Sequence, residues 1–98
     1  MSLDVDNDQI CNSDPESMYA YGNSLIFEGK NVSEGQKYIE KSIELGYVQA
    51  MFAYGHYLDY GEGVEIDKNE AMRYFKMAAD KGVDEALDYY ELIRKEVS

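Results

Sequence analysis

The chain has 98 residues, enough for one small domain with a modest core but not for two independent domains. Its formal net charge of −11 argues against binding to a nucleic-acid backbone or an anionic membrane surface, because both need clustered Lys and Arg. Apolar residues make up 45% of the sequence and Pro occurs once, so the chain is predicted to fold and to be rich in helix.

The first segment, residues 1–13, is acidic and is predicted to be a disordered tail. Its alternating aspartates at residues 4–8 imitate the start of a calcium loop, but Gln9 replaces the glycine that such a loop needs. Cys11 is the only cysteine, which excludes an internal disulfide. Because no signal peptide is visible either, a cytoplasmic location is favoured.

The first predicted hairpin begins at Asp14 and ends at Gly46. Asp14 followed by Pro15 is typical of a helix start, because Asp accepts hydrogen bonds from free backbone N–H groups and proline fits the first turn. Ser33 and Gln36 have the spacing of a capping box, which predicts where the second helix starts. Gly46 is predicted to end that helix.

The second predicted hairpin covers residues 47–82 and uses the same signals. One apolar helix face is spaced i, i+3, i+4 and i+7 and consists of Met51, Tyr54, Gly55 and Leu58. Gly61 and Gly63 are expected to end this helix in a turn. Asp67 and Glu70 then form a capping box for the next helix.

The two hairpins repeat one another, which is the signature of a helical repeat protein. Residues 17–25 align with residues 50–58 at an offset of 33, and residues 35–50 align with residues 71–86 at an offset of 36. A third copy covers only one helix, so residues 83–98 are predicted to be a C-terminal capping helix. No segment shows sustained strand alternation, and the predicted fold class is all-α.

Gly22 and Gly55 occupy the same position of the first helix in each copy. A glycine inside a helix costs about 1 kcal/mol relative to alanine. The repeated cost predicts that another helix crosses at each glycine too closely for a side chain. The third copy has Glu91 at this position, so no such crossing is expected there.

Residues 50–83 resemble the Sel1-like repeat, a relative of the tetratricopeptide repeat. The matching positions are Ala50, Tyr54-Gly55, Gly61-Glu62-Gly63-Val64, Asp67, Glu70-Ala71, Tyr74-Phe75, Ala78-Ala79 and Gly82. The resemblance implies a right-handed superhelix of α/α hairpin repeats with a concave face, which works as an adaptor or scaffold without catalysis. It divides residues 14–98 into two repeats, 14–46 and 47–82, followed by the capping helix.

The first repeat departs from the family pattern and is interpreted as degenerate. Its loop is three residues shorter than that of the second repeat. Gly35 stands where the family has alanine, and Ser42 replaces the first alanine of a pair.

Neither a metal site nor a catalytic site is predicted. His56, the only histidine, and Asp59 are three residues apart on a helix, but a zinc site needs three or four ligands. The turn at residues 61–63 has neither the lysine nor the longer glycine pattern of a phosphate loop. We therefore expect no cofactor and no enzymatic activity.

The aromatic residues divide between a predicted core and a predicted partner-binding face. The core tyrosines are Tyr21, Tyr38, Tyr54, Tyr74 and Tyr90. By resemblance to tetratricopeptide domains, a second face of the first helices lines the concave groove. This face comprises Tyr19, Asn23, Ile26, Gln49, Phe52, His56, Asp59, Tyr60, Asp88, Leu92 and Lys95. Such side chains could hold a peptide, or they could merely pack between helices or be solvated.

The leading hypothesis is a non-catalytic adaptor that binds an unidentified protein or peptide segment on the concave face. Its acidic rims would favour basic partners, whereas binding to nucleic acid and direct membrane insertion are not expected. The alternative is a structural fragment or a self-associating solenoid whose ends stack on further repeats. Tyr89 and Leu92 form a second apolar patch on the last helix that self-association could use.

Overall fold

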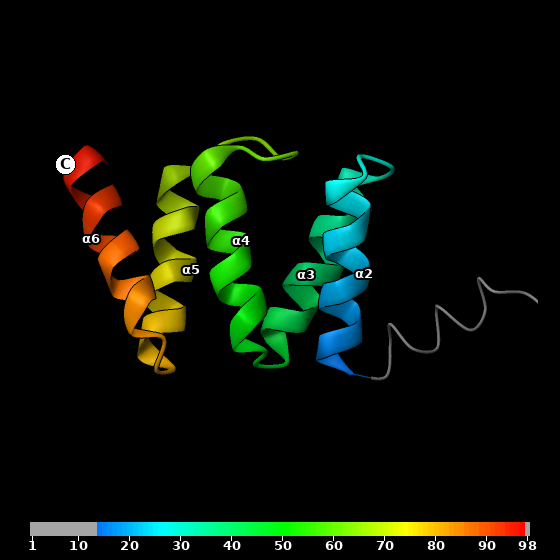
Figure 1. The fold of residues 1–98 in the computed structure, drawn as a ribbon, viewed down its shortest axis with the longest axis horizontal. Helices are drawn as coiled ribbons and strands as arrows, with labels where there is room; N and C mark the ends of the chain where they lie inside the picture. Colours follow the sequence, from blue (N-terminus) through cyan, green and yellow to red (C-terminus); the bar gives the residue numbers. More distant parts are fainter. Residues whose placement is uncertain (1–13, 98) are drawn as a thin grey trace, which may run out of the picture. The chain divides into compact units, whose positions relative to one another are not determined.

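A computed structural model describes residues 14–97, and every regular element in this range is a helix (Figure 1). The elements are α2 (Pro15–Phe27), α3 (Val32–Glu44), α4 (Val48–Tyr60), α5 (Lys68–Asp80) and α6 (Asp84–Val97). The all-α prediction is therefore confirmed. The predicted acidic tail, residues 1–13, lies outside the described residues.

The described residues belong to two compact units that divide between Tyr47 and Val48. In unit 1, α2 packs against α3, and in unit 2, α5 packs against both α4 and α6. Each unit therefore contains one helical hairpin, and unit 2 adds α6 as a third helix. The superhelical arrangement of the repeats stays a prediction.

Two of the predicted helix starts are confirmed by their hydrogen bonds. The Asp14 carboxylate accepts hydrogen bonds from the backbone N–H of Ser17 at 2.8 Å and from the Ser17 hydroxyl at 2.9 Å, and Pro15 is the first residue of α2. The Asp67 carboxylate accepts one from the backbone N–H of Glu70 at 3.1 Å. Each side chain satisfies a donor that the first helical turn leaves unpaired.

The predicted start of α3 at Ser33 is wrong. The helix begins at Val32, and its cap is Asn31, whose side chain accepts a hydrogen bond from the backbone N–H of Glu34 at 3.2 Å. Asn and Ser are about equally good caps, so a sequence that contains both within three residues does not distinguish them.

Helix ends are set by glycines as the sequence predicts. Gly46 follows α3 with φ of 91°, and Gly82 follows α5 with φ of 106°. Gly61, with φ of 74°, ends α4, and a Cβ atom placed there would lie 2.5 Å from the Ile66 side chain. A larger residue at position 61 would therefore be strained by the backbone conformation and would have to displace the Ile66 side chain.

In unit 1, α2 and α3 cross at a pair of glycines. A Cβ atom added to Gly22 would lie 2.6 Å from the Gly35 carbonyl oxygen, and one added to Gly35 would lie 2.7 Å from the Gly22 carbonyl oxygen. Because both distances are far below van der Waals contact, neither position tolerates a side chain without movement of the backbone. The close crossing predicted at Gly22 is confirmed, and Gly35 forms its other half.

In unit 2, the corresponding crossing is filled by an aromatic ring. A Cβ atom added to Gly55 would lie 2.9 Å from the edge of the Phe75 ring. Phe75 is fully buried, so its ring has little room to move away. On α6, the equivalent residue Glu91 has room for its side chain, which forms an ion pair with Arg94 at 3.3 Å.

Each unit has its own apolar interior. The interior of unit 1 contains Met18, Ile26, Ile39 and Ile43, and that of unit 2 contains Met51, Tyr54, Leu58, Tyr74, Phe75 and Ile93. Of the predicted core tyrosines, Tyr54 and Tyr74 are buried, with ring centroids 5.0 Å apart. The other three, Tyr21, Tyr38 and Tyr90, are only half-buried, so the core prediction is too broad.

Ser42, which replaces a family alanine, has a structural role in unit 1. It is completely buried, and its hydroxyl donates a hydrogen bond to the Pro15 carbonyl oxygen at 2.7 Å. This hydrogen bond therefore connects the first turn of α2 to the last turn of α3. At this position the first repeat therefore has a buried hydrogen bond where the family has a packed alanine.

Candidate functional site

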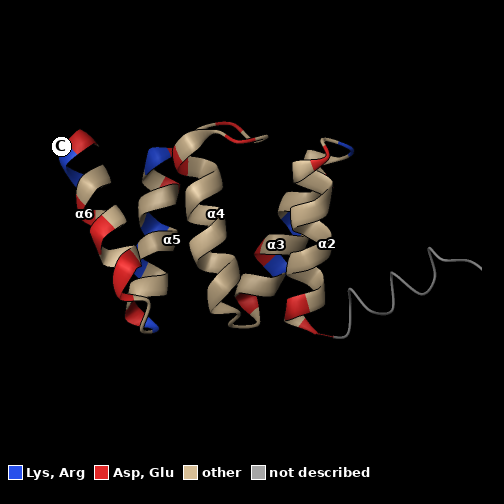
Figure 2. Cartoon of the chain, viewed as in Figure 1, with Lys and Arg blue, Asp and Glu red and all other residues tan. Residues whose placement is uncertain are grey.

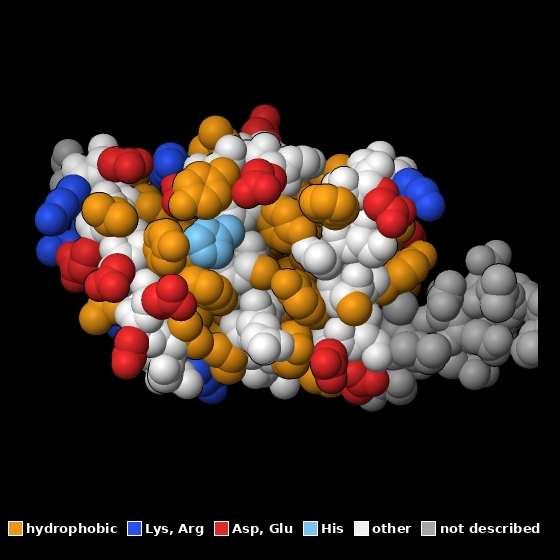
Figure 3. Space-filling view, viewed as in Figure 1, with side chains coloured by type: hydrophobic (Ala, Val, Ile, Leu, Met, Phe, Trp, Pro, Cys, Tyr) orange, Lys and Arg blue, Asp and Glu red, His pale blue; other side chains and the backbone are white. Residues whose placement is uncertain are grey.

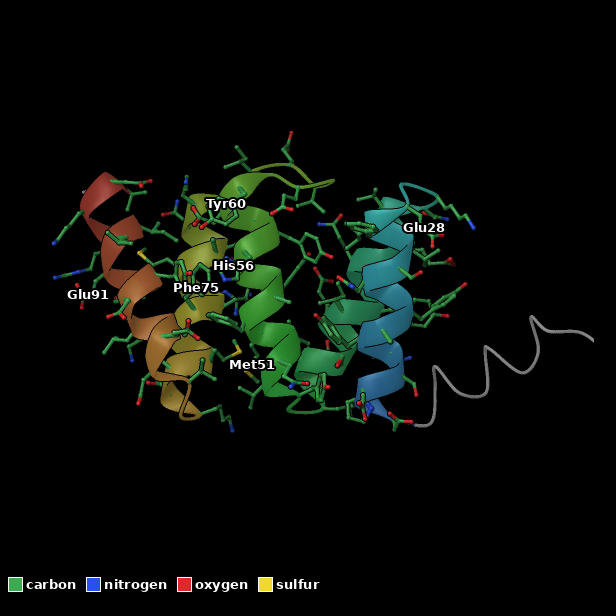
Figure 4. The ribbon with its side chains drawn as sticks, viewed as in Figure 1. Glu28, Met51, His56, Tyr60, Phe75 and Glu91 are labelled. Atoms are coloured by element: carbon green, nitrogen blue, oxygen red, sulfur yellow. The ribbon has the colours of Figure 1, made fainter. Side chains whose placement is uncertain are left out.

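One side of α4 carries three aromatic rings. Phe52, His56 and Tyr60 are spaced four residues apart, so they follow one another along a single helix face. The His56 ring centroid lies 4.7 Å from that of Phe52 in an edge-on contact. It lies 5.6 Å from that of Tyr60, with the two planes only 23° apart (Figure 4).

Rings from α5 and α6 complete the cluster. The His56 ring centroid lies 5.1 Å from that of Phe75 and 4.6 Å from that of Tyr89. Phe75 and Tyr89 also stack on each other at 5.2 Å. Because Phe75 is fully buried, it forms the floor of the cluster, and His56 lies above it among rings from three helices.

The outer part of this cluster is open to solvent. Tyr60 is 55% exposed, and Leu92, one turn from Tyr89 on α6, is 57% exposed. Phe52, His56 and Tyr89 are half-buried. We refer to these residues together as the aromatic surface: Phe52, His56, Tyr60, Tyr89 and Leu92. Figure 3 shows the histidine in pale blue with hydrophobic side chains gathered around it.

The aromatic surface is uncharged itself but has acidic neighbours. Asp59 is the only charged residue of α4, whose ribbon is otherwise free of charge in Figure 2. Glu62 lies in the turn after α4, and Glu85 and Asp88 lie on α6, all three exposed. Within residues 14–97, none of these three carboxylates forms an ion pair.

His56 remains neutral at physiological pH. Partial burial among the rings lowers its pKa below the ordinary value, and this effect exceeds the opposing influence of the carboxylates of Asp59, Glu62 and Glu85. The imidazole therefore packs as an uncharged aromatic ring against its neighbours, and its protonation in this position is unfavourable.

Asp59 does not contribute to the surface, which corrects its assignment to the predicted binding face. The residue is only 7% exposed, and its carboxylate accepts a hydrogen bond from the Lys68 ammonium at 2.6 Å. The same ammonium lies 3.3 Å from a carboxylate oxygen of Glu96. The bond with Asp59 raises the pKa of Lys68, so the ammonium stays charged. Lys68 thereby joins the end of α4, the start of α5 and the end of α6.

The predicted face residues on α2 are only partly accessible. Tyr19 is half-buried, and its ring centroid lies 5.7 Å from that of Tyr47. Asn23 is half-buried as well. Ile26 is only 2% exposed and belongs to the core of unit 1, so its assignment to the binding face is wrong. Helical spacing placed it on that face without showing that α3 covers it.

Gln49, Asp88 and Lys95, the other predicted face residues, are exposed. The sequence interpretation omitted Phe27, which is 84% exposed and corresponds to Tyr60 at the offset of 33. It also left Tyr89 out of the binding face, although this ring contacts His56. The repeat offset alone could have identified Phe27, whereas the position of Tyr89 depends on how α6 packs.

Residues 14–97 contain no group of three or more His, Cys, Asp or Glu side chains that could hold a metal ion. In the same range, each helix is too short or too polar to cross a membrane. The surface therefore consists of aromatic rings with carboxylates around them, which suits contact with a partner rather than coordination of a metal ion.

The hairpins, their glycine turns and the repeated crossing position define a helical-hairpin repeat protein. Comparison with protein families gave matches to the Sel1 repeat over residues 15–47 and 48–83, so the chain belongs to the Sel1 repeat family. Sel1 repeats are generally protein-interaction modules and are a non-catalytic type of repeat. Comparisons with curated proteins and with solved structures returned no match.

Proposed function

We propose that this chain is a non-catalytic interaction module that binds a protein or peptide segment on the aromatic surface of unit 2. The observation that carries the proposal is the exposure of Tyr60 and Leu92, at 55% and 57%, beside half-buried rings. Exposed clusters of aromatic and aliphatic side chains of this kind are typical of binding sites.

Three rings of the aromatic surface are held by contacts with the core. Phe52, His56 and Tyr89 contact the fully buried Phe75, so little side-chain entropy remains to be lost on association. Large rings held in this way are the residues that most often dominate binding energy at protein interfaces. The helix face therefore supports an anchor site for one apolar segment of a partner.

Tyr60 and Leu92 are the residues to change first. Phe52 and His56 are less suitable, because both contact Phe75 and their removal would also weaken the core of unit 2. We expect the Tyr60→Ala/Leu92→Ala variant to fold and to lose proteins that the immobilised wild-type chain captures. Quantitative mass spectrometry of the captured proteins measures this loss.

The matched control is Leu45→Ala/Leu87→Ala. These two leucines are 56% and 45% exposed and lie outside the aromatic surface. Leu87 is five residues from Leu92, on another side of the same helix. Equal loss with both double variants would contradict the assignment of the aromatic surface.

Self-association is a second candidate, favoured by the exposure of Leu92, one turn from Tyr89 on α6. If two chains pair through this helix, light scattering will show a mass that rises with concentration, and Leu92→Ala will shift the transition to higher concentration. A mass that stays at 11.2 kDa for the wild-type chain at high concentration would contradict self-association.

A further inference from the structure

Tyr60 offers an open aromatic face at the end of α4. One side of its ring stacks on His56, with centroids 5.6 Å apart and planes 23° apart, while the residue as a whole is 55% exposed. The side of the ring away from His56 therefore faces solvent. The electron-rich face of a tyrosine attracts a cation placed above it.

The charged groups that act on His56 are all negative. The carboxylates of Asp59, Glu62 and Glu85 are close enough to His56 to oppose the lowering of its pKa. Asp59 is already neutralised by Lys68, at 2.6 Å. Glu62 and Glu85 have no ion-pair partner within the described part of the chain, so the negative charges of these two carboxylates near the rings are not compensated.

The neighbouring histidine does not repel a cation. Burial keeps the pKa of His56 below its ordinary value, so the imidazole is uncharged at neutral pH. Lys68 lies near Tyr60 as well, but Asp59 and Glu96 hold its ammonium at 2.6 and 3.3 Å. The uncompensated charge next to the open ring is consequently that of Glu62, and Glu85 adds a second one near His56.

The chain contains an internal example of the same chemistry on α5. The Arg73 guanidinium lies 4.7 Å from the centroid of the Tyr74 ring and is held at 2.8 Å by the Glu70 carboxylate. An arginine there uses one tyrosine face and one glutamate. The aromatic surface offers the same two groups with no cation of its own between them.

We infer that the aromatic surface selects a segment bearing a Lys or Arg side chain, whose cation lies over Tyr60 and pairs with Glu62, while the carboxylate of Glu85 adds to the negative charge of the surface. This inference rests on the proposed function and specifies the chemistry of the partner. Apolar residues flanking the cation contact Tyr89 and Leu92. An acidic segment is rejected, because its carboxylates would face those of the surface.

A peptide with a single cation tests the inference without responding strongly to the overall charge of the chain. The probe is acetyl-Gly-Leu-Arg-Leu-Gly-amide, and its control replaces arginine with citrulline, which has nearly the same shape and no charge. Titration of the isotope-labelled full chain, followed by amide NMR, measures both affinities. We expect the arginine peptide to shift signals of Tyr60 and Glu62, and to bind at least about fivefold more tightly than the citrulline peptide.

Matched charge variants separate a local effect from a general one. Glu62→Gln/Glu85→Gln should weaken binding of the arginine peptide at least about fivefold, because the carboxylate that pairs with the cation and the nearby charge of Glu85 are both lost. Glu34→Gln/Glu44→Gln removes two exposed acids from α3 of unit 1 and should change affinity by less than about twofold. Circular dichroism of each variant confirms that its helices are intact.

The outcomes also separate this inference from the proposed function. Equal weakening by the two charge variants, or equal binding of the arginine and citrulline peptides, would overturn the inference. Failure of the arginine peptide to bind would overturn it too. If in these cases Tyr60→Ala/Leu92→Ala still abolishes protein capture, the interaction surface stands and only its preference for a basic side chain is wrong.

Discussion

Gly22 and Gly35 show how single residues without side chains fix the geometry of unit 1. A Cβ atom added to either glycine would lie only 2.6–2.7 Å from the carbonyl oxygen of the other. Alanine is favoured over glycine in an isolated helix, yet here it would push two backbones apart. The sequence predicted the crossing at Gly22 because the cost of a helical glycine recurs at Gly55, whereas Gly35 seemed to be a mere departure from the family pattern.

Gly22→Ala is therefore expected to destabilise the chain by about 1–3 kcal/mol, even though alanine improves intrinsic helix propensity. Urea denaturation followed by circular dichroism measures the change. The matched control is Glu91→Ala, at the equivalent position of α6, where we expect a change of less than about 0.5 kcal/mol. A Gly22→Ala variant as stable as the wild type would contradict the close crossing.

His56 couples the stability of unit 2 to pH. Its pKa in the folded chain is lowered by burial, so the unfolded chain takes up the proton more readily. As the pH falls below the ordinary histidine pKa of about 6.5, protonation favours the unfolded state and the free energy of unfolding decreases. The loss is complete once the pH has fallen through the lowered pKa of the folded chain.

We expect the melting temperature of the wild-type chain to fall between pH 7.5 and pH 5.5 more steeply than that of His56→Gln, in which this titration is absent. Thermal denaturation at intermediate pH values compares the two slopes. Parallel slopes would show that His56 does not carry the pH dependence.

At the scale of helices, the sequence located the elements well because caps and glycine turns leave clear local signals. Asp14, Asp67, Gly61 and Gly82 all act as predicted. Signals that compete locally are harder to rank, and Ser33 was chosen where Asn31 forms the cap. The choice depends on where the backbone enters the helix, and sequence spacing does not contain that information.

The two candidates for the α3 cap give opposite predictions. Asn31→Ala should destabilise the chain by about 1 kcal/mol, because the backbone N–H of Glu34 loses its acceptor. Ser33→Ala should leave stability nearly unchanged or raise it slightly, since the residue lies inside the helix. Urea denaturation of both variants checks the pair, and the reverse order would restore Ser33 as the cap.

Helix faces were harder to assign than helix ends. Spacing placed Ile26 and Asp59 beside exposed residues, but α3 covers the first and Lys68 binds the second. Periodicity identifies which residues share a face and says nothing about how much of that face a neighbouring helix covers. For the same reason, periodicity could not predict the contact of Tyr89 with His56, which depends on the packing of α6.

Across the whole molecule, the two repeats have diverged in what their first helices present. The positions of Phe52, His56 and Tyr60 in unit 2 correspond to Tyr19, Asn23 and Phe27 in unit 1. Only in unit 2 does the set join rings from two further helices. A third helix, α6, supplies Tyr89 and Leu92, so the helix that follows the second repeat also completes the proposed site.

The dissociation constant of a captured segment tests the aromatic surface most directly. Calorimetry would compare the wild-type chain, Tyr60→Ala/Leu92→Ala and the control Leu45→Ala/Leu87→Ala with the same segment. We predict that the surface variant binds at least about tenfold more weakly, because two exposed anchors are removed, while the control stays within about twofold. A surface variant that binds as tightly as the wild type would contradict the account.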